Sequence, residues 1–146
     1  YFSFPMAVKL TSGKVLAVDI EPEMLKLIER RKIVDIVNNI DIIDTIVASE
    51  RSPNIPNASV DVVLVVDAYH EFSYPREVMA GVVKGLKPDG RVVLVEYRGE
   101  DSSVAIKPLH KMTQRQVKKE MSAVGLQWLR TDDYLPQQHV MVFSKQ

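Results

Sequence analysis

The chain of 146 residues carries 19 acidic and 19 basic side chains, and 46% of its residues are hydrophobic, a composition typical of one globular domain. The balanced charge argues against nucleic acid as a partner, since polyanion binding needs a basic excess. The absence of cysteine excludes disulfides and thiolate zinc sites, and apolar runs such as Val62 to Val66 are too short to cross a membrane, so we expect a cytoplasmic protein without a membrane partner.

The first third of the chain predicts a helix end, a strand, a helix and a second strand. Residues 1–10 indicate a helix that ends before Gly13. Val15–Ile20 is a short apolar strand, and Pro22 begins a helix that we expect to reach about Asn38. The β-branched segment Ile42–Ser49 predicts the next strand.

The middle of the chain continues the same alternation. Two prolines exclude regular structure from Glu50–Pro56, and Asn57–Ser59 is a turn. Val60–Asp67 is nearly continuously apolar, which is typical of a central parallel strand covered on both faces. Pro75 begins a helix, and Lys87–Gly90 predicts a turn into the next strand.

The last part of the chain changes pattern. After the strand Arg91–Tyr97, Thr113 is expected to cap an amphipathic helix, with Gln116 at its third position. Leu126–Thr131 and Val140–Ser144 then follow each other with only a loop between them, which predicts an antiparallel hairpin. The sequence therefore predicts an α/β fold with a Rossmann-like, doubly wound and mostly parallel sheet that ends in an antiparallel β-hairpin.

An acidic residue, Asp19, ends the first predicted strand directly before a helix. In nucleotide-binding α/β domains such a carboxylate accepts hydrogen bonds from both ribose hydroxyls. The alternative is a helix cap for the Pro22 helix. A glycine-rich loop belongs about twenty residues upstream of such an acid, and the sequence before Asp19 has none.

Three segments together resemble the class I S-adenosylmethionine-dependent methyltransferases. They are the strand that ends in Asp19, the segment Val66-Asp-Ala-Tyr-His-Glu-Phe72, and Leu86-Lys-Pro-Asp-Gly-Arg-Val-Val-Leu-Val-Glu96 with its Leu-Lys-Pro-x-Gly turn. Further segments, including Val95–Arg98 and Ile106–Met112, resemble a group of small uncharacterised bacterial methyltransferases. The resemblance extends over nearly all of the chain and implies the class I methyltransferase fold.

The resemblance implies S-adenosylmethionine as the cofactor and assigns residues to it. Asp19 would bind the ribose, Ile20 and Met24 would pack on one side of the adenine, and Ser49 and Glu50 would line the other side. The family's usual acid near the adenine is replaced here by Glu50-Arg51-Ser52, which puts carboxylate recognition of the adenine in doubt. Near the methionyl part, the resemblance places Asp67 and Ala68.

The family's first strand and its glycine loop have no counterpart in the sequence, and in the family that strand lies between the strands ending at Asp19 and Asp67. Buried backbone groups left unpaired would cost about 1–3 kcal/mol each. We therefore expect residues 1–146 to be a single, N-terminally incomplete domain. Either a segment precedes Tyr1, or another chain fills the gap, as in a homo-oligomer.

The candidate catalytic residues are Tyr69, His70 and Glu71, a phenol, an imidazole and a carboxylate beside Asp67. The imidazole of His70 could accept a proton from the nucleophile; the alternative is a loop histidine satisfied by backbone groups. Glu96 and His110 could face the same cleft. A metal ion held by His70, Glu71, His110 and His139 is conceivable, but without spacing such as His-x-x-x-His we predict no metal site.

The function predicted from these residues is methyl transfer from S-adenosylmethionine to a small-molecule acceptor. Methyl transfer needs mainly alignment of donor and nucleophile, so no single side chain is obligatory. One alternative is an inactive methyltransferase-like module that binds a partner. Another is a NAD-dependent oxidoreductase, which would share Asp19 but not the Leu86–Gly90 turn or the hairpin.

Overall fold

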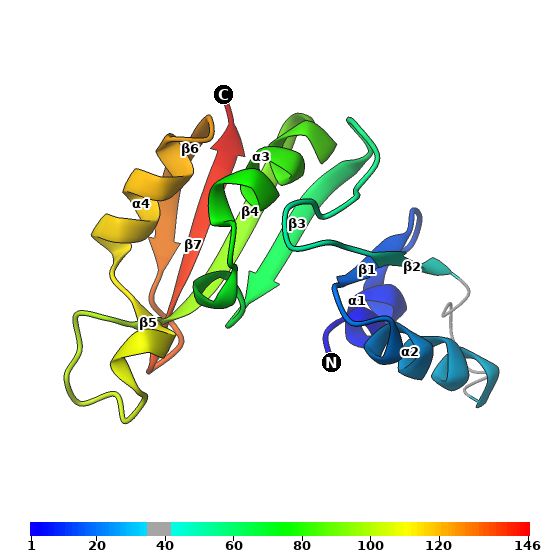
Figure 1. The fold of residues 1–146 in the computed structure, drawn as a ribbon, viewed down its shortest axis with the longest axis horizontal. Helices are drawn as coiled ribbons and strands as arrows, with labels where there is room; N and C mark the ends of the chain where they lie inside the picture. Colours follow the sequence, from blue (N-terminus) through cyan, green and yellow to red (C-terminus); the bar gives the residue numbers. More distant parts are fainter. Residues whose placement is uncertain (35–41) are drawn as a thin grey trace. The chain divides into compact units, whose positions relative to one another are not determined.

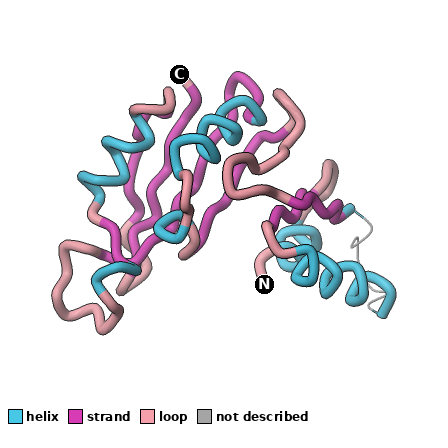
Figure 2. The backbone as a smooth tube through the Cα atoms, viewed as in Figure 1, coloured by secondary structure: helices cyan, strands magenta, loops and turns pink. Residues whose placement is uncertain are grey.

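The computed structural model describes residues 1–34 and 42–146, which form two compact units (Figures 1 and 2). Unit 1 is Tyr1–Asn54 and unit 2 is Ile55–Gln146. The expectation of a single domain stays a prediction, and each unit is described by itself.

Unit 1 is a two-stranded parallel sheet with two helices. Its elements are α1 (Ser3–Lys9), β1 (Val15–Asp19), α2 (Pro22–Val34) and β2 (Ile43–Val47). The strands pair in register from Val15↔Ile43 to Asp19↔Val47. Gly13, with a φ of 91°, reverses the chain after α1, as predicted. The predicted end of the second helix, Asn38, lies outside the described residues.

The core of unit 1 is small. It consists of five buried residues: Phe4, Ala7, Val15, Ala17 and Ile43. Alternate residues of β1 point into it, because successive side chains of a strand point to opposite faces. Because β1 and β2 run parallel, their carboxyl ends lie at the same edge of this sheet.

Unit 2 contains the rest of the chain. Its strands are β3 (Val60–Val66), β4 (Leu86–Arg98), β5 (Lys111–Met112), β6 (Leu126–Asp132) and β7 (Gln138–Lys145). Its α-helices are α3 (Pro75–Gly85) and α4 (Gln114–Ser122), and two short 3₁₀ turns are η2 (Tyr69–Glu71) and η3 (Pro108–His110).

The sheet of unit 2 has the order β3-β4-β7-β6, with β5 paired to the end of β4. β3 and β5 run parallel to β4, whereas β7 runs antiparallel to both β4 and β6. The predicted Rossmann-like α/β architecture, with parallel strands followed by an antiparallel hairpin, is thereby confirmed.

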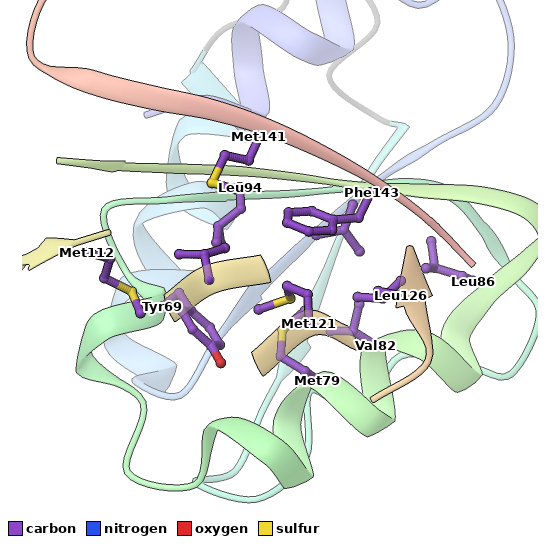
Figure 3. Close-up of a cluster of buried hydrophobic side chains, with 12 residues drawn as sticks. Tyr69, Met79, Val82, Leu86, Leu94, Met112, Met121, Leu126, Met141 and Phe143 are labelled. Atoms are coloured by element: carbon purple, nitrogen blue, oxygen red, sulfur yellow. The ribbon is translucent and has the colours of Figure 1, made fainter. Parts of the chain in front are cut away.

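The helices α3 and α4 cover one face of this sheet, and the core lies beneath them (Figure 1). The helical spacing of Met79 and Val82 on α3, and of Val117 and Met121 on α4, brings these side chains against the sheet. Figure 3 shows Met79, Val82 and Met121 facing the inward side chains of β4, β6 and β7, among which are Leu94, Leu126, Met141 and Phe143. As predicted, Thr113 caps α4, because its side-chain oxygen accepts a hydrogen bond from the Gln116 N–H at 3.1 Å.

One expectation about unit 2 stays a prediction and another is wrong. In the described chain β3 ends the unit 2 sheet, and none of its residues is fully buried. Coverage of β3 on both faces would need the strand expected beside it and so stays a prediction. Lys87–Gly90 is not a turn before the strand but an irregular segment within β4, where pairing passes from Val60↔Leu86 to Val62↔Arg91. A Cβ at Gly90 would lie 2.8 Å from Leu86 Cδ2, so this segment folds too tightly on itself for a side chain there.

β1 pairs with β2, and β3 pairs with β4. The strand expected between the strands ending at Asp19 and Asp67, from a preceding segment or from another chain, stays a prediction.

β6, at the end of the unit 2 sheet opposite β3, carries the single tryptophan of the chain. The Lys118 ammonium lies 3.5 Å from the centroid of the Trp128 ring, a cation–π contact that joins α4 to β6.

None of the helices in the described part of the chain has the length and apolar character needed to span a bilayer.

Candidate functional site

The first group of predicted site residues lies at the carboxyl edge of the unit 1 sheet. Asp19 is the last residue of β1, and its Oδ1 accepts a hydrogen bond from the Glu21 N–H at 2.9 Å. The Ala48 N–H donates to the Asp19 carbonyl at 2.8 Å and so ties the end of β2 to the end of β1. The carboxylate is thus held by a local turn at Oδ1, at the position that the sequence predicts.

The other predicted cofactor residues of unit 1 flank this edge. Ile20 and Met24 are both exposed apolar side chains, one after β1 and one in the first turn of α2. Ser49 pairs with Ser52 through the Ser49 N–H, which donates to the Ser52 carbonyl at 2.8 Å, and Glu50 is exposed within the resulting tight turn. Because β1 and β2 are parallel neighbours, the structure brings Asp19 and the Ser49 turn to the same sheet edge.

The second group begins where β3 ends. Asp67 has a φ of 46°, an unusual conformation for a residue other than glycine, and its N–H continues the sheet by donating to the Val95 carbonyl at 2.9 Å. Gln138 Nε2 donates to Asp67 Oδ2 at 2.6 Å. The other oxygen, Oδ1, is buried and has no hydrogen-bond partner in the described part of the chain. Ala68 follows as the residue before η2.

Tyr69 points into the core of unit 2, among leucine and methionine side chains (Figure 3). Its hydroxyl donates to Glu120 Oε2 at 2.7 Å. Burial, together with the hydrogen bond and charge of Glu120, raises the pKa of this phenol well above its usual range. Tyr69 thus packs in the core of unit 2, and its predicted catalytic role stays a prediction.

His70 forms a buried pair with Glu96. The His70 Nδ1–H donates to Glu96 Oε2 at 2.6 Å, and the Tyr69 N–H donates to Glu96 Oε1 at 2.9 Å. Only 7% of the His70 side chain and 1% of the Glu96 side chain are exposed. Burial raises the pKa of Glu96, while the hydrogen bond and charge of His70 oppose that rise.

The strand register explains why Glu96 is buried. Residues 92, 94 and 96 of β4 point to the face that α3 and α4 cover, because side chains alternate along a strand. Val92 and Leu94 enter the apolar core, and Glu96 is the next inward position, at the end of the strand. A charge at a core position without a partner would be costly, and His70 and the Tyr69 N–H supply the partners.

His110 and Glu71 complete this group. His70 Nε2 lies 3.0 Å from His110 Nδ1, and Glu71 Oε1 lies 3.8 Å from each of these two nitrogens. The two short turns η2 and η3 bring the three residues together, although His110 is 40 residues from His70 in the sequence. Glu96 and His110 both contact His70, and the expectation that they face one cleft stays a prediction. His139 instead contacts Glu100 Oε2 at 2.8 Å.

Sequence reasoning missed the contribution of β7 to the site. Gln138 holds Asp67, and His139 lies opposite Glu96 in the antiparallel register, with Gln138 opposite Tyr97. The signal was the hairpin itself: once its second strand is aligned against the Arg91–Tyr97 strand, Gln138 falls at the carboxyl end of the parallel strands. The lengths of the two strands did not fix that alignment.

Comparison with known protein families identifies the family to which the chain belongs. A model described as "Methyltransferase domain" matches residues 2–94, which is more than half of the chain. The chain belongs to the methyltransferase-domain family. The resemblance to class I methyltransferases is confirmed, and this methyltransferase domain is that of an enzyme. Its sequence matches no curated protein.

Solved structures show that the fold of this methyltransferase domain is shared. A SAM-dependent methyltransferase from Aquifex aeolicus is 17% identical with a TM-score of 0.84, over 97% of this chain and 74% of that one. A putative type 11 methyltransferase from Sulfolobus solfataricus is 22% identical with a TM-score of 0.72, over 91% and 72%. A Burkholderia thailandensis 1,6-didemethyltoxoflavin-N1-methyltransferase, with bound 1,6-didemethyltoxoflavin and S-adenosylhomocysteine, is 17% identical with a TM-score of 0.65, over 90% and 61%.

Proposed function

We propose that this methyltransferase domain transfers a methyl group from S-adenosylmethionine to a small-molecule acceptor. The observation that carries the proposal is an acidic residue, Asp19, at the end of a parallel strand in a chain whose family is that of methyltransferase domains. The neighbour from Burkholderia thailandensis, solved with a small molecule and S-adenosylhomocysteine, has the same fold and supports this choice of donor and acceptor class.

The residues of unit 1 fit the adenosyl part of the donor. Oδ1 of Asp19 accepts a hydrogen bond from the Glu21 N–H, and no hydrogen bond to Oδ2 occurs among the described residues. A carboxylate oxygen in that state can accept from a ribose hydroxyl. Ile20 and Met24 are exposed apolar side chains beside it, and an adenine ring packed on them would remove them from water. Ser49 and Glu50 are the residues that we propose for the other side of the adenine.

The carboxylate of Asp67 fits a cationic part of the donor. Its Oδ1 is a buried acceptor without a partner in the described chain, and such an atom is costly to leave unsatisfied. An ammonium group, such as that of the methionyl part, would satisfy it with a charge-assisted hydrogen bond. We therefore keep Asp67 and Ala68 as cofactor-binding residues.

The donor supplies the reactive methyl group, because its sulfonium makes that carbon electrophilic. What the chain must provide is the position of the nucleophile. We propose that His70 and Glu71 face the acceptor, since Glu96 fixes the orientation of the His70 ring and 65% of the Glu71 side chain is exposed. The balanced net charge supports a small acceptor over a polyanion.

Calorimetric titration of the full-length protein with S-adenosylhomocysteine and, separately, with NAD tests the donor. We expect binding of S-adenosylhomocysteine and none of NAD, because Asp19 recognises a ribose in both ligands but the family assigns only the first. Binding of NAD alone would make the domain an oxidoreductase. Binding of S-adenosylhomocysteine with no methyl transfer from S-adenosylmethionine to any member of a small-molecule acceptor panel would favour the inactive binding module.

A further inference from the structure

Three possible metal ligands from two short turns converge in unit 2. They are Nε2 of His70, Nδ1 of His110 and Oε1 of Glu71, whose mutual separations are 3.0, 3.8 and 3.8 Å. A hydrogen bond between the two imidazoles would account for the shortest of these distances, but it would not account for the carboxylate oxygen at equal distances from both nitrogens.

The size of this triangle matches the coordination sphere of a transition metal ion. A point equidistant from three atoms with these separations lies about 2.1 Å from each of them. Zinc is bound by histidine nitrogen at roughly 2.0–2.1 Å and by carboxylate oxygen at roughly 2.0–2.2 Å. The three atoms therefore need little movement to bind one ion together.

The surroundings of His70 are those of a metal ligand. Metal-binding histidines usually donate their second ring N–H to a carboxylate, which fixes the tautomer and makes the free nitrogen a better ligand. Glu96 does this for His70, with 2.6 Å between Oε2 and Nδ1, and the Tyr69 N–H holds Glu96 in place at 2.9 Å. Nε2 of His70 consequently presents its lone pair toward His110 and Glu71.

The exposure of the three side chains leaves room for a further ligand. The His70 side chain is 7% exposed, whereas His110 and Glu71 are 44% and 65% exposed, so one side of the triangle is closed and the other meets solvent. Two histidines and one glutamate with an open fourth position form a ligand set that zinc uses in catalytic sites. Imidazole ligands disfavour Mg²⁺ and Ca²⁺, which prefer oxygen.

We propose that His70, His110 and Glu71 bind a divalent transition metal ion, for which zinc is the best match, with one position open to water or to an oxygen or nitrogen atom of a ligand. In the metal-free protein the His110 Nδ1–H donates to His70 Nε2. On binding, the proton of His110 moves through solvent from Nδ1 to Nε2, so that both nitrogens of the triangle offer lone pairs and the two rings stay neutral. The metal-binding step requires neither the methyl donor nor an acceptor.

Competition between the tag-free, full-length protein and a chromophoric chelator for Zn²⁺ measures this binding. We expect one Zn²⁺ per chain, and His110→Ala and Glu71→Gln should each weaken it at least tenfold, since each removes one of three ligands. Both residues lie at the surface, so these variants should keep the fold, which far-UV circular dichroism checks. Glu96→Gln should weaken binding about 10–100-fold by loosening His70.

His139 provides the matched control, because it is the only other histidine of the chain and lies outside the triangle. His139→Gln should bind Zn²⁺ as the unchanged protein does. Loading with Co²⁺ should give visible absorption typical of a four- or five-coordinate ion in the unchanged protein and lose it in His110→Ala. Equal Zn²⁺ affinity in the unchanged protein and His110→Ala, or binding abolished only by His139→Gln, would refute the metal site.

The outcome for the metal is separable from the outcome for the donor. Failure to bind Zn²⁺ leaves the titration with S-adenosylhomocysteine unaffected, since the carboxylates proposed for the donor, Asp19 and Asp67, are not among the three metal ligands. Binding of Zn²⁺ without any binding of S-adenosylhomocysteine would leave the metal site in place and remove the proposed methyl transfer.

Discussion

Asp19 and Asp67 both follow a parallel strand, but the contacts of their carboxylates differ. Asp19 lies at a local turn, where the Glu21 N–H occupies Oδ1. Asp67 is bound through Oδ2 to Gln138, a residue 71 positions later, and keeps a buried free Oδ1. The first carboxylate can thus be positioned by its own strand and turn, whereas the second depends on the terminal hairpin being in place.

Replacement of Asp19 tests its predicted contact with ribose. Asp19→Ala in the full-length protein should weaken S-adenosylhomocysteine binding at least tenfold, about 1.4 kcal/mol, because charge-assisted hydrogen bonds to the hydroxyls are lost. Isothermal titration calorimetry measures the change. Asp44→Ala is the control, since Asp44 lies on the neighbouring strand β2 and, among the described residues, its side chain pairs with exposed Lys14 alone. Unchanged affinity in Asp19→Ala would remove this residue from the site.

Glu100 predicts part of the acid sensitivity of the fold. Partial burial would raise its pKa, but hydrogen bonds from His139 and from the Gln114 N–H outweigh burial and lower it. A carboxyl with a lowered pKa in the folded state contributes stability above its unfolded pKa, and that contribution is lost as the pH falls through the lowered value. Asp133, 3.9 Å from His139, is the other acid facing this pair.

We therefore expect Glu100→Gln to lower stability at pH 6 and to differ less from the unchanged protein near pH 3. Urea unfolding at both pH values, followed by circular dichroism, measures this. Glu23→Gln is the control, because Glu23 forms only an exposed pair with Lys26 and should change little at either pH. A Glu100→Gln protein with the same stability deficit at both pH values would contradict this assignment.

At the scale of elements, the helix cap of α4 carries a testable share of stability. Thr113→Ala removes the side-chain acceptor of the Gln116 N–H and should destabilise the protein by about 1 kcal/mol. The urea midpoint is the measurement. Thr113→Ser keeps the hydroxyl and should keep most of the stability; equal losses in both variants would assign the effect to the lost methyl group rather than to the cap.

Elements with a clear hydrophobic period could be predicted, and elements without one could not. α3 and α4 show their helical spacing in the sequence, and Thr113 and Pro75 mark where they start. The turns η2 and η3 and the two-residue strand β5 are too short to have a period. They are formed by contacts such as Tyr97↔Lys111, which are tertiary and leave no local signal.

The candidate site also has residues that could be predicted from the sequence and residues that could not. Asp19, Ser49 and Asp67 could be placed because each follows an apolar strand, and strand ends are visible in the sequence. The sequence makes His70, Glu71, His110 and His139 conceivable metal ligands but predicts no site, since the approach of His110 to His70 depends on η3 returning to η2 and leaves no local spacing. The apolar run of β3 predicts a strand covered on both faces, which stays a prediction because the strand expected beside it is not among the described residues.

At the scale of the molecule, the two units differ in the cores that support them. Among the described residues, unit 1 has a two-stranded sheet and a cluster of five buried core residues, whereas unit 2 has five strands and a cluster of twelve. The free energy gained on folding grows with the apolar area removed from water, so the larger core stabilises its unit more. We therefore expect unit 2 to be the more stable of the two.

Limited trypsin digestion should expose this difference. Arg51 is exposed and lies shortly before the boundary between the units, so we expect an early cut there and a persistent fragment Ser52–Gln146, identified by mass spectrometry. Residues 1–51 should be degraded further, because α2 carries exposed cleavage sites such as Arg30. Arg51→Gln should suppress the early cut. First cleavage inside unit 2, or loss of both units at one rate, would indicate a single cooperative domain instead.

Trp128, which Lys118 contacts, provides a fluorescence signal from unit 2 that unit 1 does not share. Trp128 is the only indole in the chain, and it belongs to unit 2, where the ammonium above its ring depends on α4 remaining docked on β6. Its fluorescence emission should therefore report the unfolding of residues 55–146 alone, while ellipticity sums over both units. If residues 1–54 unfold first, thermal unfolding followed by ellipticity should show two midpoints, and tryptophan fluorescence should show only the later one.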